Sequence, residues 1–219
     1  MITLEEIKKD PAIRTYITRA DESLIALGFT EHSFAHVTRV ASVAKYILET
    51  LGYSEREVEI AQIAGYLHDI GNLVNRIDHA QSGAVMAFRI LDRMGASPED
   101  IATITTAIGN HDEGTAVAVN PTAAALILGD KTDVRRSRVR NQDPMSFDIH
   151  DRVNYSVKSS KVSISDDRSV FGLTLDIDTT YCSIMDYFEI FLARMVLCRK
   201  AAEKLGMKFQ LTINGQRVI

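Results

Sequence analysis

The chain has 219 residues, of which 46% are hydrophobic and 25% charged, a balance typical of a soluble globular protein with one domain, or with one domain and a smaller partner. With 25 Lys and Arg residues against 29 Asp and Glu residues, the net charge of −4 excludes a bulk attraction to nucleic acid or to an anionic membrane. No segment stays apolar over the roughly 18 residues that a membrane span needs, so we expect neither a membrane nor a nucleic acid as partner.

Apolar residues recur at helical spacing up to about residue 136. Pro11 suits a first helical turn and Gly28 a stop, and Ser54-x-x-Glu57 has the spacing of a capping box. These signals, and similar ones further on, predict helices over residues 11–27, 33–51, 54–67, 78–94, 97–111 and 122–136. The third of these is apolar nearly all round before Leu67, so we expect it to be central and buried.

The pattern changes near residues 141–144. Beyond them, alternation predicts strands at Val153–Val157, Val162–Ile164 and Val170–Ile177, a long helix over Ser183–Leu205 and a last strand at Lys208–Ile213. We therefore expect a mostly α fold, with an all-helical domain of residues 1–142 and a small α+β subdomain of residues 143–219. That subdomain should combine an antiparallel sheet with one long helix.

The role of the small subdomain stays open at this point. Its long helix is richly apolar, which suits either a core for the sheet or a homodimer interface, and a lid over a substrate is a further alternative. Its cysteines, Cys182 and Cys198, are the only ones in the chain and form no CxxC pattern, which favours buried free thiols in a reducing compartment. Since the first residues are acidic and lack the apolar stretch of a signal peptide, we expect a cytoplasmic protein.

Residues of the kinds that bind metals lie at the ends or inner faces of the expected helices. They are His36, His68, Asp69, His79, His111 and Asp130. His68 and Asp69 close the buried third helix, where a carboxylate is costly unless it is paired or bound to a metal. Gly71 allows the helix to open there, so that both side chains can face one site. Because so many residues of this kind lie at the ends or inner faces of apolar helices, we expect them to form a shared metal centre.

The ordered set His36-x-x-Arg39, His68-Asp69-Ile70-Gly71, His79, His111 and Asp130 resembles the HD superfamily of metal-dependent phosphohydrolases. The resemblance covers roughly residues 30–140. Members with two extra histidines between the His-Asp pair and the last Asp are two-metal enzymes, and His79 and His111 occupy those places. The short spacing from His68 to His79 is similar to that of the bacterial diadenosine tetraphosphate hydrolases of this superfamily.

The resemblance implies a role for each ligand. His36, His68, Asp69 and Asp130 would hold one metal ion, and Asp69 would bridge to a second ion held also by His79 and His111. Imidazole and carboxylate ligands favour Fe or Mn, with Zn, Ni, Mg or Co also open. A hydroxide that bridges the ions would attack phosphorus, so Asp69 is a catalytic residue as well as a ligand.

A phosphorylated substrate needs positive charge beyond the metals, and the chain carries a basic run over residues 131–140. Lys131 follows the last ligand directly, so we expect it to be catalytic and to bind substrate, with Arg135 and Arg136 as further substrate contacts. A solvated basic helix end is the plainer alternative for the run. His32, one helical turn before His36, and Asn72 are also candidate substrate contacts.

The expected function is therefore a metal-dependent phosphohydrolase that cleaves a phosphoester or phosphoanhydride of a small nucleotide or related substrate. Certain HD proteins with the same ligand plan resemble mixed-valent di-iron oxygenases, and the ligands alone do not separate the two classes. A regulatory module that binds a nucleotide without turnover is a third alternative. The intact ligand set disfavours it, because degenerate sites usually lose ligands.

Overall fold

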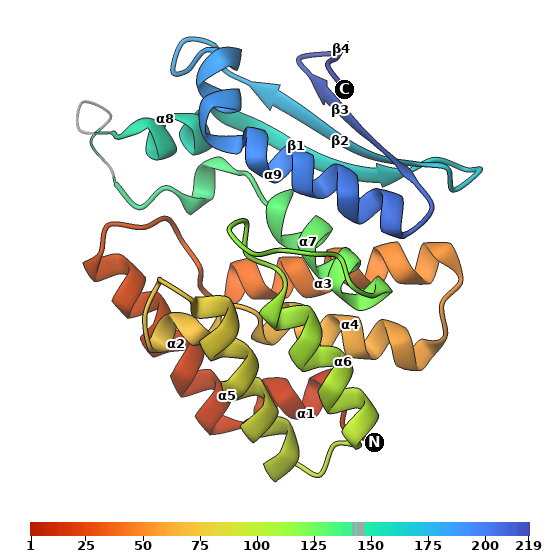
Figure 1. The fold of residues 1–219 in the computed structure, drawn as a ribbon. Coiled ribbons are helices and arrows are strands. Elements are labelled where there is room, and N and C mark those ends of the chain that lie inside the picture. The colour runs from red at the N-terminus through yellow and green to blue at the C-terminus, as the bar shows by residue number, and fades with distance from the viewer. Residues whose placement is uncertain (142, 144–146) are drawn as a thin grey trace.

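The structure is a computed structural model, and it describes residues 1–141, 143 and 147–219. Figure 1 shows a helical layer, in which α3 and α7 lie nearest to the C-terminal part of the chain, and in that part a sheet covered by α9. The helices are α1 (Leu4–Lys9), α2 (Pro11–Ala26), α3 (Phe34–Leu51), α4 (Glu55–Leu67), α5 (His79–Arg93), α6 (Pro98–Gly109), α7 (Pro121–Lys131), α8 (Ile149–Ser156) and α9 (Ile184–Lys204). The 3₁₀ turns are η1 (Ile70–Leu73) and η2 (Arg136–Arg138), and the strands are β1 (Val157–Ile164), β2 (Val170–Ile177), β3 (Lys208–Ile213) and β4 (Gln216–Arg217).

Side-chain caps set most of the helix starts. The capping box expected at the start of α4 is present, because the Ser54 side chain accepts from the Glu57 amide and the Glu57 carboxylate accepts from the Ser54 amide at 2.9 Å. Ser97 caps α6, which has a proline in its first turn. In the helical layer, α1 was not anticipated from the sequence, and α7 ends at Lys131 and not near Arg136.

The sheet has the order β1-β2-β3-β4 and is mixed rather than wholly antiparallel. β1 pairs antiparallel with β2, and β3 with β4, whereas β2 and β3 pair in parallel. The parallel pair follows from α9, because a helix that crosses between two neighbouring strands brings the chain back in the same direction. Alternate residues of β2 and β3, from Phe171 and from Phe209 onward, are buried on the face that packs against α9.

The strand expected at Val153–Val157 is wrong, since residues 149–156 form α8. Asp148 caps this helix by accepting from the Asp151 amide. Val153 and Val157 are both buried and lie four residues apart, a spacing that one helical face also satisfies. A pattern this short therefore does not distinguish a strand from a helix.

Two hydrophobic cores meet at α3, α4 and α7. One core joins α1, α2, α5 and α6 to these three helices, and the other joins α8, α9 and the sheet to their opposite faces. In α7, Ala123 and Leu126 face the first core and Ile127 and Leu128 the second, which explains why this helix is apolar all round. The mostly α fold with a small α+β part at the C-terminal end is thus confirmed.

Residues 147–219, called the tail below, share their core with the helical layer. Arg39 of α3 donates to the backbone oxygen of Ser160 in β1 at 3.2 Å, and the Tyr46 hydroxyl of α3 accepts from the Ile164 amide at 3.0 Å. The subdomain boundary expected at residue 142 lies outside the described residues. None of the helices in the described part of the chain has the length and apolar character of a membrane span.

Two glycines allow the close backbone approaches that place ligand-type residues together. A Cβ on Gly129 of α7 would lie 2.9 Å from the backbone oxygen of Val40 in α3, so this glycine lets α7 approach α3 closely. A Cβ on Gly71 of η1 would lie 2.0 Å from the backbone oxygen of His79 and 2.4 Å from the amide nitrogen of Gly83. The turn after His68-Asp69 therefore packs directly on the first turn of α5.

Replacing Gly71 with alanine is expected to destabilise the protein by about 1–3 kcal/mol or more, because backbone atoms rather than a flexible side chain must move away. Urea unfolding monitored by circular dichroism measures the effect. Gly114→Ala is the matched control, since the nearest atom to a Cβ there is 3.9 Å away. An unchanged unfolding midpoint in Gly71→Ala would show that the backbones are not in this close contact.

Candidate metal centre

The residues singled out as ligands come from five helices whose ends or inner faces converge. His36 lies on the buried face of α3, and His68 and Asp69 lie where α4 gives way to η1. His79 begins α5, His111 follows α6, and Asp130 lies in the last turn of α7. All of these side chains are buried except that of Asp130, which is 12% exposed. The structure thus brings together the whole set proposed from the sequence.

The imidazole Nε2 atoms of the cluster point toward the two carboxylates. His36 Nε2 lies 3.4 Å from Asp130 Oδ1, and His68 Nε2 lies 3.8 Å from the same oxygen. Ligand atoms of His36, His68 and Asp130 lie within 4.8 Å of one another, and so do those of His68, Asp69 and His111. Several of these buried atoms have no hydrogen-bond partner among the described residues: His36 Nε2, His68 Nε2, His111 Nε2 and Asp69 Oδ2. Buried polar atoms are costly without a partner, and metal ions would satisfy these four.

The opposite ring nitrogens are held from behind. Nδ1 of His68, His79 and His111 lies 2.8, 3.0 and 2.6 Å from the backbone oxygens of Gly65, Arg76 and Ile108 respectively. His36 Nδ1 lies 2.8 Å from Asp133 Oδ2. In a neutral imidazole, an Nδ1–H that donates to an oxygen leaves Nε2 unprotonated, which is the form that binds a metal.

Asp69 faces both halves of the cluster. Its Oδ2 lies 3.5 Å from His36 Nε2 and 3.3 Å from His68 Nε2, whereas its Oδ1 lies 3.5 Å from His79 Nε2. A carboxylate whose two oxygens face different histidines in this way is arranged so that each oxygen could bind a different metal ion. Asn72 fixes this orientation, because its side-chain amide donates to Asp69 Oδ1 at 3.0 Å and to the Asp69 backbone oxygen at 2.9 Å.

The protonation states of Asp69 and His111 suit metal binding. Burial alone would raise the pKa of Asp69, but the neighbouring His68 lowers it well below its usual range. Burial lowers the pKa of His111 to about 3, and the positive charge of Lys131 acts in the same direction. Asp69 is therefore ionised and His111 neutral at physiological pH.

Asp133 holds His36 and is itself held by arginines. Its buried carboxylate accepts from Arg39 Nε and Arg135 Nε, each at 2.9 Å, besides the contact with His36 Nδ1. Burial would raise the pKa of Asp133, but the His36 contact and the nearby arginines keep it far below its usual range. A charged carboxylate behind a ligating imidazole orients the ring and raises its basicity.

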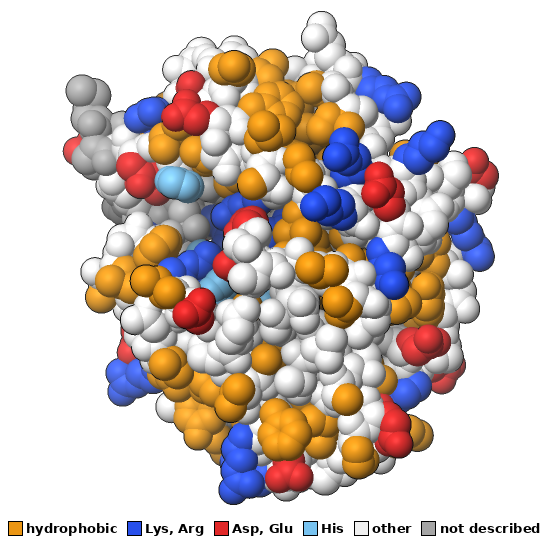
Figure 2. All heavy atoms as spheres, viewed as in Figure 1, with side chains coloured by type: hydrophobic (Ala, Val, Ile, Leu, Met, Phe, Trp, Pro, Cys, Tyr) orange, Lys and Arg blue, Asp and Glu red, His pale blue; other side chains and the backbone are white. Residues whose placement is uncertain are grey.

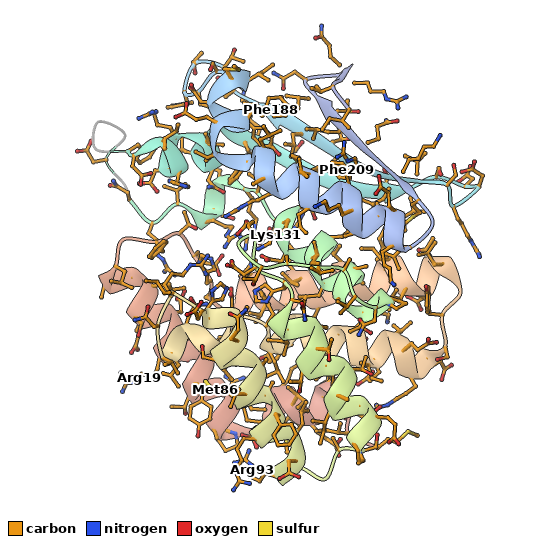
Figure 3. The ribbon with its side chains drawn as sticks, in the orientation of Figure 1. Arg19, Met86, Arg93, Lys131, Phe188 and Phe209 are labelled. Carbon is orange, nitrogen blue, oxygen red and sulfur yellow. The ribbon has the colours of Figure 1, made fainter. Side chains whose placement is uncertain are left out.

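Lys131 lies between the metal centre and Glu113. Its Nζ is 2.7 Å from Asp130 Oδ2 and 3.5 Å from Glu113 Oε1. Burial alone would lower the pKa of Lys131, but these two carboxylates raise it above its ordinary value. Burial would raise the pKa of Glu113, but Lys131 and Arg194 lower it to about 2, so both partners are charged. Figure 3 shows Lys131 at the junction of the helical layer and the tail.

A cavity of about 420 Å³ opens beside the cluster, and Asp69, His79 and Asp130 form part of its wall. Figure 2 looks into the hollow between the helical layer and the tail, where histidine and Lys or Arg side chains are visible. Besides Lys131, the cations along the cavity are Arg76, Arg138 and Arg194. Asn154 and Phe191 from the tail also line it. The tail residues and Arg76 were not anticipated from the sequence, and Arg138 was noticed only as part of the basic run.

The residues expected to contact substrate divide into two groups. His32 and Lys131 line the cavity, and the His32 ring lies 5.4 Å from that of His36. Arg135 and Arg136 do not line it, which corrects the sequence expectation. Because α7 stops at Lys131, the chain turns and Arg135 pairs with Asp133 and Glu31, while Arg136 donates to the Tyr155 backbone oxygen and lies 4.4 Å over the Tyr155 ring.

Asn72 lies beside the ligand rather than along the cavity, so we expect Asn72→Ala to weaken metal binding about 10–100-fold and to leave KM nearly unchanged. Titration of the metal-free protein with Mn²⁺ measures the first effect, and steady-state kinetics at saturating metal the second. Asn75→Ala, an exposed change nearby, is the control. A raised KM with unchanged metal affinity would return Asn72 to the role of substrate contact.

Comparison with known proteins gives three findings. The family model described as HD domain matches residues 33–147. An uncharacterised protein from Methanocaldococcus jannaschii is 25% identical over 189 residues, which cover 76% of this chain and 73% of that protein. The crystal structure of a predicted HD superfamily hydrolase from an uncultured Thermotogales bacterium has a TM-score of 0.44 and 26% identity, over 62% of this chain and 75% of that chain.

The matched region 33–147 contains every residue of the buried cluster and stops where the tail begins. The narrower similarity to diadenosine tetraphosphate hydrolases stays a prediction.

Proposed function

This chain belongs to the HD-domain family, and from that premise we propose that it is a two-metal phosphohydrolase. It cleaves a phosphoester or phosphoanhydride bond of a small nucleotide or a related substrate. The observation that carries the proposal is a set of buried atoms without hydrogen-bond partners among the described residues, beside a cavity that Lys131 and three arginines help to line. These atoms are the Nε2 atoms of His36, His68 and His111 and Oδ2 of Asp69.

The residues present fit two divalent ions, and we assign them as the sequence suggests. His36, His68, Asp69 and Asp130 would hold one ion, and Asp69, His79 and His111 would hold the other. Mixed imidazole and carboxylate ligands favour Fe or Mn, with Zn, Ni, Mg or Co as alternatives. When bound, two such ions supply a nucleophile from water at neutral pH and neutralise charge on the phosphoryl group.

The chain's own residues complete the chemistry. The Lys131 ammonium lies along the cavity beside Asp130, where it binds a phosphoryl oxygen and stabilises the negative charge that develops there. Asn72 and Asp133 hold Asp69 and His36 in their orientations. The tail closes one side of the cavity and limits the access of bulk water. The buried free cysteines Cys182 and Cys198 support the cytoplasm as the place of action.

The charges along the cavity and the ligand set favour this function over the two alternatives. A neutral polyol, one substrate class of the similar oxygenases, would leave Arg76, for which no ion pair with a described residue is found, without an anionic partner in the cavity. A module that binds without turnover has no need of the complete ligand set that the structure brings together.

A substrate panel tests the proposal. Protein purified without oxygen and loaded with Mn²⁺ or Fe²⁺ is incubated with nucleoside monophosphates, cyclic nucleotides, nucleoside polyphosphates and diadenosine tetraphosphate. Release of phosphate or of nucleotide products, without oxygen consumption, is the expected result. Oxygen uptake on addition of a phosphonate or polyol, together with no hydrolysis across the panel, would instead support the oxygenase.

A further inference from the structure

Arg194 reaches the cavity from the tail, outside the region 33–147 that matches the family model. It lies on α9, and its side chain is 27% exposed. Phe191, one turn earlier on the same helix, also lines the cavity and is 1% exposed. The tail therefore contributes both a cation and an aromatic ring to the cavity that Asp69, His79 and Asp130 of the metal centre also line.

Two contacts hold the guanidinium of Arg194 in place. Its Nε lies 2.5 Å from Glu113 Oε1, and its Cζ lies 4.6 Å over the ring of Phe191. Glu113 also faces Lys131, so Asp130, Lys131, Glu113 and Arg194 form a chain of ion pairs that alternate in charge, of which Asp130, Lys131 and Arg194 line the cavity. Lys131 contacts the metal ligand Asp130 directly, whereas Arg194 is connected to Lys131 only through Glu113.

Arg194 keeps unused donors. A guanidinium has five N–H donors, and no hydrogen bond from the terminal nitrogens of Arg194 to a described residue is found. In Arg138, by comparison, Nε donates to the backbone oxygen of Glu31 and Nη1 donates to that of Asp133. An arginine that is fixed by its Nε and its ring face, with its free edge along a cavity, is arranged to bind an anion.

We propose that Arg194 binds a second anionic group of the substrate, beyond the phosphoryl group that Lys131 and the metal centre hold. The tail and the helical layer then form the substrate site together, and the preferred substrate carries at least two phosphate groups. The inference rests on the proposed phosphohydrolase function and adds this substrate class to it. Asn154, which is 6% exposed, is a further residue of the tail that lines the cavity.

The test measures binding rather than turnover. Metal-loaded protein is titrated in a calorimeter with orthophosphate, which has one phosphate group, and with pyrophosphate, which has two. Since hydrogen bonds between charged groups dominate at such a site, Arg194→Met should weaken pyrophosphate binding about 10–100-fold and orthophosphate binding far less. Arg194→Lys should recover part of the loss, because it restores the charge without the planar fork.

Arg199→Met is the matched control, since Arg199 lies on the same helix with a side chain that is 54% exposed. Metal content and thermal unfolding of each variant show whether the fold and the metal centre persist. Equal pyrophosphate affinity in Arg194→Met and the unchanged protein, or an equal loss for both anions, would overturn the inference. Absence of hydrolysis across the substrate panel would instead count against the proposed function, so the two failures are distinguishable.

Discussion

Replacing Asp69 with asparagine is expected to remove bound metal and hydrolytic activity together. Asp69 directs Oδ2 at His36 and His68 and Oδ1 at His79, so its charge serves both halves of the cluster. Metal ions supply several kcal/mol of transition-state stabilisation in such reactions, and about 1.4 kcal/mol corresponds to a tenfold change in rate. We therefore expect kcat/KM to fall about 10³-fold or more.

Metal content by mass spectrometry and kcat/KM with the best substrate of the panel measure this effect. Asp92→Asn is the control, because Asp92 lies on the surface of α5 in an exposed ion pair with Arg89. Thermal unfolding distinguishes a lost site from a lost fold. Two ions per chain in Asp69→Asn would rule out the bridging role.

The second large effect is expected at Lys131. Lys131→Met should lower kcat about 10²–10³-fold while the metal content stays at the level of the unchanged protein. The metal is retained because a bound cation compensates the charge of Asp130 after the ammonium is gone, and Arg194 remains as the partner of Glu113. The loss falls on kcat because the ammonium stabilises charge that develops only during the reaction.

Single-turnover and steady-state kinetics at saturating metal measure the change, with Lys45→Met as the control at an exposed position of α3. A variant that loses metal in parallel with activity would show that Lys131 acts on the ligand Asp130 and not on the substrate. Full activity in Lys131→Met would remove it from the chemistry altogether.

Local signals were sufficient for most of the helical layer. Ser54 and Glu57 mark the start of α4 through contacts three residues apart, and Gly71 marks the place where the helix can open. The ligand-type residues could be grouped because each stands at the end or inner face of an apolar helix. Their order along the chain, rather than any single His or Asp, made the grouping specific.

The sequence was less informative about the tail, for physical reasons. Val153 and Val157 fit a helical face as well as a strand, and pairing between β2 and β3 depends on where α9 crosses. Substrate contacts were misplaced because charge in a basic run does not say which side chains turn inward. Arg135 turns to Asp133, whereas Arg194, a lone cation in the apolar stretch of α9, reaches the cavity. That isolated arginine was the signal available beforehand.

The most direct test of the two-metal centre is a crystal structure of protein purified without oxygen, with anomalous data collected at the iron and manganese edges. Two ions are predicted, one among His36, His68, Asp69 and Asp130 and one among Asp69, His79 and His111. A single ion, or a second ion away from His79 and His111, would contradict the two-metal assignment.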